Sequence, residues 1–186
     1  MVDKILEGAL SLYRSKGLKF TMDELAIALK MSKKTIYKLY VDKQELVCAM
    51  VNYAFDNIKE TEDSIYYDET LSTIEKLKGI LTALPENYSG FNYDNVYMFK
   101  DKYPLAYRDL CVRLESDWDK TLELLQEAMD QGLVRQVDKD LFKFTYEAAV
   151  EHLLTSNYLS RKNIDYPTAF RQVVDIIVEG IIVKEK

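Results

Sequence analysis

Cysteine and histidine are scarce in this sequence, and with them the usual ligands of disulfide and metal sites. Two cysteines, Cys48 and Cys111, lie far apart and form no CxxC pair, and His152 is the single histidine. A disulfide framework or a zinc site needs several such residues at characteristic spacings. We therefore expect packed thiols, no bound metal and no cofactor.

The residue patterns of enzymes are missing as well. The chain has no HExxH spacing, no nucleophile elbow and no glycine-rich phosphate loop, and its carboxylates are scattered as on ordinary helical surfaces. Catalysis needs a converging set of such groups. The sequence therefore favours a protein that is not an enzyme.

Long apolar runs are absent, and proline and glycine are few. A membrane span requires about 18 consecutive apolar residues, which no stretch approaches. Asp3 and Glu7 interrupt the first apolar stretch, unlike the core of a secretory signal. Three prolines, six glycines and 30% charged residues argue against a disordered chain. We expect a cytoplasmic globular protein with no membrane partner.

Helical periodicity is what the sequence does contain. Hydrophobic residues make up 48% of the 186 residues, enough for the cores of one or two small domains. Apolar positions recur at helical spacing, and strand-like alternation is not sustained anywhere. The predicted fold class is all-α. About nine helices are expected, at residues 5–16, 22–29, 33–40, 43–58, 71–84, 88–99, 104–131, 139–161 and 167–183.

The formal net charge of -6 is unevenly distributed along the chain. Residues 1–50 carry nine Lys and Arg against six acids, a net of +3, so the remainder carries -9. Such asymmetry suggests a basic head that meets a polyanion and an acidic body that does not.

Two short helices in this basic head have the spacing of a helix-turn-helix. The first starts at a capping box, Thr21 to Glu24, and the second starts after Ser32. In the second helix Ile36 and Leu39 point inward, and Tyr40 is spaced for the same face. The opposite face is left with Lys33, Lys34, Thr35, Tyr37 and Lys38. Such side chains suit phosphates and base edges in a major groove, although lysines on short helices are usually only solvated charges, and Tyr37 also suits packing against the first helix.

This segment resembles the N-terminal region of the TetR family of bacterial transcription regulators. The resemblance is carried by Ile5-Leu6-Glu7-Gly8-Ala9, Lys16-Gly17, Ser32-Lys33-Lys34-Thr35-Ile36-Tyr37 and Lys43-Gln44-Glu45-Leu46. It implies that Lys33, Thr35 and Tyr37 meet DNA and that Lys43 touches backbone phosphate. Lys34 replaces a frequent glycine, Leu39 replaces a frequent aromatic residue or histidine, and the stretch from Gly17 to Thr21 is one residue short. The predicted DNA contacts are Thr21, Ser32, Lys33, Lys34, Thr35, Tyr37, Lys38, Tyr40 and Lys43.

The close resemblance covers about the first fifty residues, and we predict two domains. Residues 1–46 form the DNA-binding domain, and residues 47–186 form a domain for ligand sensing and dimerisation. The last two helices are apolar around much of their circumference, so one buried face is not enough for them. The resemblance implies that they pair with their counterparts across a twofold axis into a four-helix bundle, with burial inside one chain as the alternative. Such a homodimer spaces its recognition helices about 34–36 Å apart and reads a near-palindromic operator. The predicted interface residues are Leu141, Ala148, Leu153, Phe170, Val173, Val174, Ile177 and Ile181.

Aromatic residues are frequent in the middle of the chain, and the resemblance implies a small-molecule pocket there. Aromatic walls with occasional polar tips suit such a pocket, although plain core is their more common role. The predicted contacts are Tyr97, Tyr107, Cys111, Leu114, Trp118, Tyr146 and His152, the last of which also suits a structural role in the bundle.

The function that the resemblance implies is that of a DNA-binding repressor, which an unidentified small-molecule effector releases from double-stranded operator DNA. Effector binding would act as a population shift between two spacings of the DNA-reading heads. The alternatives are a similar regulator controlled by a protein partner and a helical interaction module without regulatory DNA binding.

Overall fold

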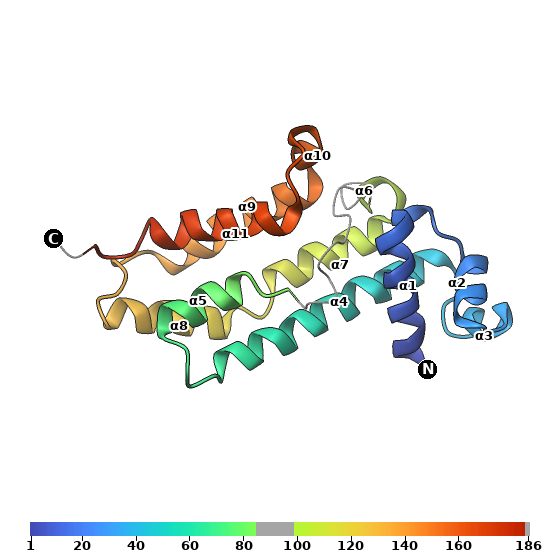
Figure 1. Cartoon of the computed structure of the whole chain (residues 1–186), viewed down its shortest axis with the longest axis horizontal. Coiled ribbons are helices and arrows are strands. Elements are labelled where there is room, and N and C mark those ends of the chain that lie inside the picture. The colour runs from blue at the N-terminus through green and yellow to red at the C-terminus, as the bar shows by residue number, and fades with distance from the viewer. Residues whose placement is uncertain (85–98, 185–186) are drawn as a thin grey trace.

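The computed structural model describes residues 1–84 and 99–184, and in these ranges the regular elements are all helices, joined by turns and short loops (Figure 1). They form no strand, although an isolated antiparallel bridge joins Val134 and Ile182. The predicted all-α fold class is confirmed. The elements are α1 (Val2–Lys16), the 3-10 helix η1 (Gly17–Lys19), α2 (Met22–Leu29), α3 (Lys33–Tyr37), α4 (Lys43–Tyr66), α5 (Thr73–Leu81), α6 (Phe99–Lys102), α7 (Pro104–Glu115), α8 (Asp119–Asp130), α9 (Lys139–Thr155), α10 (Tyr158–Lys162) and α11 (Tyr166–Glu179).

The first three helices form a small unit at one end of the molecule, and local sequence signals set their limits. Thr21 and Glu24 form the capping box that starts α2. Lys30 adopts a left-handed conformation, with φ of 53°, which ends α2 and turns the chain into α3. Phe20 and Ile36 are fully buried between these helices. The unit therefore has its own apolar centre, which holds α3 at a fixed orientation.

Helix α4 joins this unit to the rest of the molecule. Asp42 caps its first turn, and its 24 residues extend about 36 Å at the usual rise per residue. Its first turns pack against α1, and its later turns pack against α5 and α7 (Figure 1). One continuous helix therefore crosses the predicted domain boundary after residue 46.

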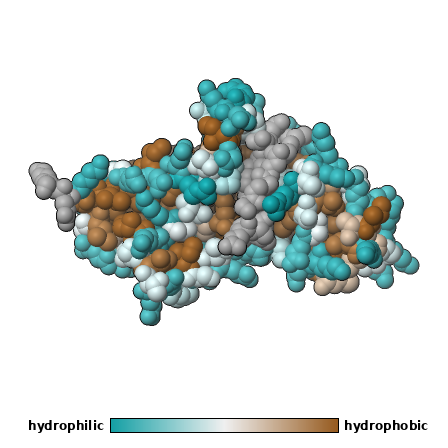
Figure 2. All heavy atoms as spheres, viewed as in Figure 1, coloured by the Kyte–Doolittle hydropathy of each residue, from teal (hydrophilic) through white to brown (hydrophobic). Residues whose placement is uncertain are grey.

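The body is a bundle in which α5 packs on α8, and α9 and α11 lie side by side along one side (Figure 1). Its centre is apolar, with Leu77, Leu125, Val174 and Val178 almost completely buried. On the face shown in Figure 2, apolar surface gathers at the end of the body that lies away from α1.

Several predicted helix boundaries are wrong. The helix expected at 43–58 continues to Tyr66. The helix expected at 104–131 is interrupted at residues 116–118, where Asp117 takes a left-handed conformation with φ of 59° and the Trp118 ring turns inward. The helix expected at 139–161 ends at Thr155 and is followed by the separate short α10, and the last helix ends at Glu179 rather than at residue 183. The helix expected at 88–99 lies outside the described residues except for Phe99.

Candidate DNA-binding surface and ligand cavity

Helix α3 presents a polar face with a buried anchor behind it. Ser32 caps the helix by accepting a hydrogen bond from the backbone N–H of Thr35, and the two hydroxyls lie 2.8 Å apart. Ile36 is fully buried, whereas Tyr37 is 45% exposed. The exposed face also carries Lys33, Lys34 and Lys38. These side chains lie together on one short, rigidly anchored helix.

The lysines of this face differ in their partners. The ammonium of Lys33 forms an ion pair of 2.5 Å with Asp23 of α2. Lys34 and Lys38 form no ion pair with any of the residues that the structure describes. Lys34 and Lys38 are therefore available to bind a phosphate, whereas Lys33 must first break its ion pair with Asp23.

Three other predicted DNA contacts have partners within the protein. The hydroxyl of Thr21 accepts the N–H of Glu24 in the capping box. Tyr40 is only 7% exposed, and burial raises the pKa of its hydroxyl. The ammonium of Lys43 donates to the carbonyl oxygens of Leu18, at 2.6 Å, and of Phe20.

The Lys43 ammonium also lies 4.2 Å from the centroid of the Phe20 ring and 5.7 Å from that of Tyr103. Its pKa is lowered, chiefly by burial and then by the nearby charge of Lys102. Lys43 thus joins the start of α4 to the chain around η1 and to the residue that precedes α7.

A cavity of about 190 Å³ lies within the bundle and reaches the N-terminal unit formed by α1, α2 and α3. Leu10 and Tyr13 of α1 line one part of it, beside Phe99 of α6. Along α4 the wall extends from Met50 to Glu62, which corresponds to about 18 Å of helix. Most of the wall is apolar, as in many small-molecule sites.

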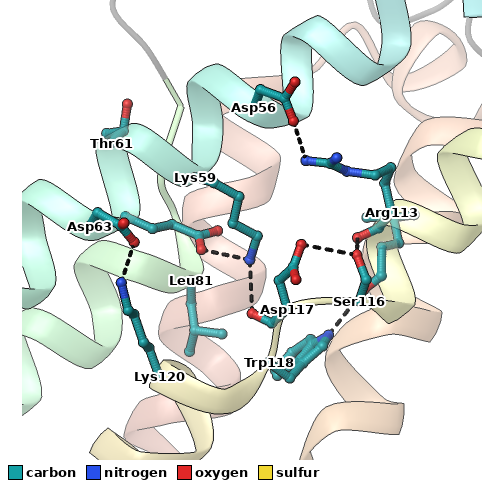
Figure 3. Close-up of polar contacts among 12 residues, drawn as sticks. Asp56, Lys59, Thr61, Asp63, Leu81, Arg113, Ser116, Asp117, Trp118 and Lys120 are labelled. Carbon is teal, nitrogen blue, oxygen red and sulfur yellow. Dashed lines mark hydrogen bonds and ion pairs between the residues drawn. The ribbon is translucent and has the colours of Figure 1, made fainter.

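The part of the cavity near the break between α7 and α8 is polar (Figure 3). Lys59 of α4 donates to Glu62 at 2.7 Å and to the backbone carbonyl oxygen of Asp117 at 2.9 Å. Burial raises the pKa of Glu62 despite this partner. Arg113 forms an ion pair of 2.8 Å with Asp56, also on α4. Charged groups therefore bridge α4 to the break.

Only some of the predicted ligand contacts line the cavity. Leu114, Trp118 and Tyr146 line the cavity, and the hydroxyl of Tyr146 donates to the carbonyl of Leu81 at 2.8 Å. Three others lie outside the wall: Tyr107 donates to Glu151 at 2.9 Å, Cys111 is half-buried, and His152 is exposed. Tyr97 lies outside the described residues.

Sequence reasoning missed the charged members of this wall, Lys59, Glu62 and Arg113. On α4 the first two belong to a polar run, which has the same appearance in the sequence as a solvated helix surface. Only their position beside the break at residues 116–118 distinguishes them from solvated surface residues, and no glycine or proline in the sequence predicts that break.

The predicted dimer residues also differ in how exposed their side chains are. Leu141 is 64% exposed and Ala148 is exposed, both on α9, whereas Phe170 of α11 is 5% exposed and lines the cavity. Two further apolar side chains are exposed on the same pair of helices, Phe144 at 66% and Ile176 at 73%. The remaining predicted residues are half-buried (Leu153, Val173, Ile177) or buried (Val174, Ile181).

In residues 1–84 and 99–184 no helix combines the length and apolar character needed to cross a membrane. The same ranges hold no group of three or more His, Cys, Asp or Glu side chains arranged to hold a metal ion.

Comparison with known proteins agrees with this architecture. The family described as bacterial regulatory proteins, tetR family, matches residues 5–50. Over 186 residues the chain is 30% identical to the uncharacterized HTH-type transcriptional regulator YvaF of Bacillus subtilis (strain 168), which covers 100% of this chain and 98% of that protein.

Two solved structures have the same fold. The regulatory protein TetR from Rhodobacter sphaeroides has a TM-score of 0.75 at 16% identity, over 97% of this chain and 98% of that chain. The regulator FadR from Bacillus subtilis, in complex with stearoyl-CoA, has a TM-score of 0.68 at 15% identity, over 97% of this chain and 100% of that chain. By its N-terminal match and its full-length likeness to YvaF, the chain belongs to the TetR family of bacterial transcription regulators.

Proposed function

We propose that this regulator is a homodimeric repressor that leaves a near-palindromic operator when a small molecule occupies its cavity. Residues 1–46 would read the DNA, and residues 47–186 would sense the ligand and form the dimer. The observation that carries the proposal is that both parts of the chain contribute to the wall of one cavity: Leu10 and Tyr13 of α1 line it together with the body helices.

The DNA contacts are proposed for the exposed face of α3. Lys34 and Lys38 are free to neutralise phosphates, and Tyr37 is exposed on the same helix, which Ile36 anchors. Phosphate contacts fix the position of a recognition helix, while side chains that reach base edges give sequence preference. The net charge of +3 over residues 1–50 supports approach to DNA by this end of the chain.

The dimer contact is proposed for α9 and α11. Leu141, Phe144 and Ile176 leave large apolar side chains exposed on these two neighbouring helices. Apolar clusters of this kind mark association surfaces, and a twofold pairing of two helices from each subunit buries them in a four-helix bundle.

Ligand control is proposed to act through α1 and α4. A molecule in the cavity contacts Tyr13 directly, and Tyr13 is only 5% exposed inside the DNA-binding unit. Because packed interiors tolerate little change in volume, a ligand there favours a different seating of α1 and therefore a different spacing of the two α3 helices. The solved complex of FadR with stearoyl-CoA, a protein of the same fold, supports control by a small molecule.

The test is a DNA-binding titration by fluorescence anisotropy at several salt concentrations, using the DNA upstream of the chain's own gene and random DNA. We expect preference for one upstream sequence, and Tyr37→Ala should abolish that preference. Lys34→Ala should lower the slope of log affinity against log salt by about 0.9 for its lost phosphate contact. Lys162→Ala, an exposed lysine on α10, is the matched control and should change neither. Equal affinity for all DNA, or unchanged binding by the α3 variants, would refute the proposal.

A further inference from the structure

The cavity has two chemically different ends, which constrain the shape of a ligand. Its apolar end reaches Tyr13 of α1 and Phe99 of α6, and its polar end contains Lys59 and Arg113 beside the break after α7 (Figure 3). The α4 residues of the wall extend over about 18 Å between these ends. An elongated molecule with one apolar and one polar end fits this arrangement.

Arg113 offers the polar end an unused donor. Its Nη2 is paired with Asp56 and its guanidinium lies 5.6 Å from the centroid of the Phe55 ring, but its Nε is buried without a hydrogen-bond partner. Among the described residues one other buried side-chain polar atom lacks a hydrogen bond, Oε1 of Glu147, and that residue is not part of the cavity wall. A buried N–H without an acceptor is costly, so the Arg113 Nε favours a ligand that brings an acceptor.

The neighbouring charges are already paired. The Lys59 ammonium donates to Glu62 and to the carbonyl of Asp117. The Ser116 hydroxyl lies 3.1 Å from the carbonyl of Arg113 and 3.2 Å from the Asp117 carboxylate. The group that is missing at this end is therefore an oxygen acceptor for the Arg113 Nε, rather than a donor or a cation.

We infer, resting on the proposed role of the cavity as the effector site, that the effector is an alkyl chain ending in a carbonyl or carboxylate oxygen. The oxygen accepts from the Nε of Arg113, and the chain runs along α4 toward Tyr13 of α1. A free fatty carboxylate and an acyl thioester both present such an oxygen. The head group then sets affinity, and the length of the chain sets how strongly α1 is displaced.

Trp118 provides a direct binding signal because it is the only tryptophan and its buried side chain lines the cavity. The probes are decanoate, decanoyl-CoA, decan-1-ol and decylamine, which share one chain length and differ in head group. We expect decanoate or decanoyl-CoA to change Trp118 fluorescence at concentrations about 10- to 100-fold lower than decan-1-ol or decylamine. The order of the first two distinguishes the free acid from the thioester. Equal binding of acid, thioester and alcohol, or preference for the amine, would overturn the inference.

The assignment to Arg113 is tested by variants on the same helix. Arg113→Met keeps most of the stem volume and removes the donor, so it should weaken the preferred probe about 10- to 100-fold while leaving decylamine, whose ammonium has no acceptor for the Arg113 N–H, unweakened. Arg108→Met, an exposed arginine of α7, should behave like the parent. Asp56→Asn removes the ion pair but keeps the Nε donor, and it should retain binding. Unchanged affinity in Arg113→Met would refute the assignment.

The direction of the chain is tested with Ala54→Leu, which narrows the α4 wall between the two ends. Octanoate, decanoate and dodecanoate, or their thioesters, should show an optimum shifted to the shorter chain in this variant, with the head-group preference unchanged. An unchanged length optimum would contradict the direction. Failure of the proposed function is separate: probes that bind with the predicted preference but leave DNA affinity unchanged would refute ligand control and leave the ligand class standing.

Discussion

Replacing Lys43 by methionine separates two roles for this side chain, an internal tether and a phosphate contact. In the structure its ammonium donates to the carbonyl oxygens of Leu18 and Phe20 and lies over the Phe20 ring. Methionine keeps the apolar stem and removes the charge. The variant therefore deletes these polar contacts with little change in packing.

The expected cost in the free energy of unfolding follows from these contacts. Each charge-assisted hydrogen bond contributes about 1.5–3 kcal/mol, and the two carbonyl oxygens lose a partner when the ammonium is removed. Burial of the ammonium opposes this, as its lowered pKa indicates. We expect a net loss of about 2 kcal/mol, which for a chain of this size lowers the Tm by roughly 4–8 °C.

The assay combines thermal unfolding with the salt dependence of DNA binding, and Lys38→Met is the crossed control. Lys38 is exposed on α3, so its replacement should leave Tm unchanged and lower the salt slope by about 0.9. Lys43→Met should lower Tm and leave the slope unchanged. The reasoning is refuted if Lys43→Met keeps the parent Tm and loses a unit of slope, since the side chain would then serve a phosphate.

Three further predictions address other contacts. Asp23→Asn releases Lys33 and removes an acid beside α3, so DNA affinity in anisotropy titrations should rise roughly threefold to tenfold at low salt and converge with the parent at high salt. Phe144→Glu should convert the dimer to a folded monomer in light scattering, whereas Val112→Glu, at an exposed apolar position on α7, should not. Glu24→Ala breaks the capping box of α2 and should cost about 1 kcal/mol in denaturant unfolding, whereas Glu24→Gln, which still accepts the backbone N–H, should cost less. Equal losses in the last pair would show that the ion pair with Lys16, rather than the cap, stabilises this turn.

Much of the DNA-binding unit was predictable because its determinants are local. The capping box at Thr21, the caps at Ser32 and Asp42, and the inward position of Ile36 all depend on neighbours within one or two turns. Gly132 follows α8 and has a positive φ, and a glycine placed there in the sequence predicts the end of a helix. Local rules of this kind give the same result whatever the rest of the chain does.

The cavity was harder to predict because long-range packing forms it. The segment Leu114 to Trp118 has no helix-breaking residue, and its apolar spacing continues that of a single long helix. The chain breaks there because Trp118 turns inward to become buried, with its indole N–H donating to the carbonyl of Leu114 at 3.0 Å and its ring 5.2 Å from that of Tyr146 on α9. An interaction between residues so far apart in the sequence leaves no periodic signal.

In the proposed ligand control, the same break and helix α4 would transmit a change at the cavity to the DNA-binding unit. Lys43, at its start, is bound to carbonyl oxygens around η1, and Lys59, about 24 Å further along the helix, is bound to the carbonyl of Asp117 at the break. Both tethers are hydrogen bonds from a flexible side chain, which tolerate rotation of the helix better than close-packed apolar contacts do. In this proposal a ligand bound at Arg113 lies near the Lys59 tether. A chain that reaches Tyr13 contacts the group of rings, Phe99 and Tyr103, that leads to Lys43. Effects on DNA binding should then require both ends of the ligand, which neither a short carboxylate nor a simple alkane supplies.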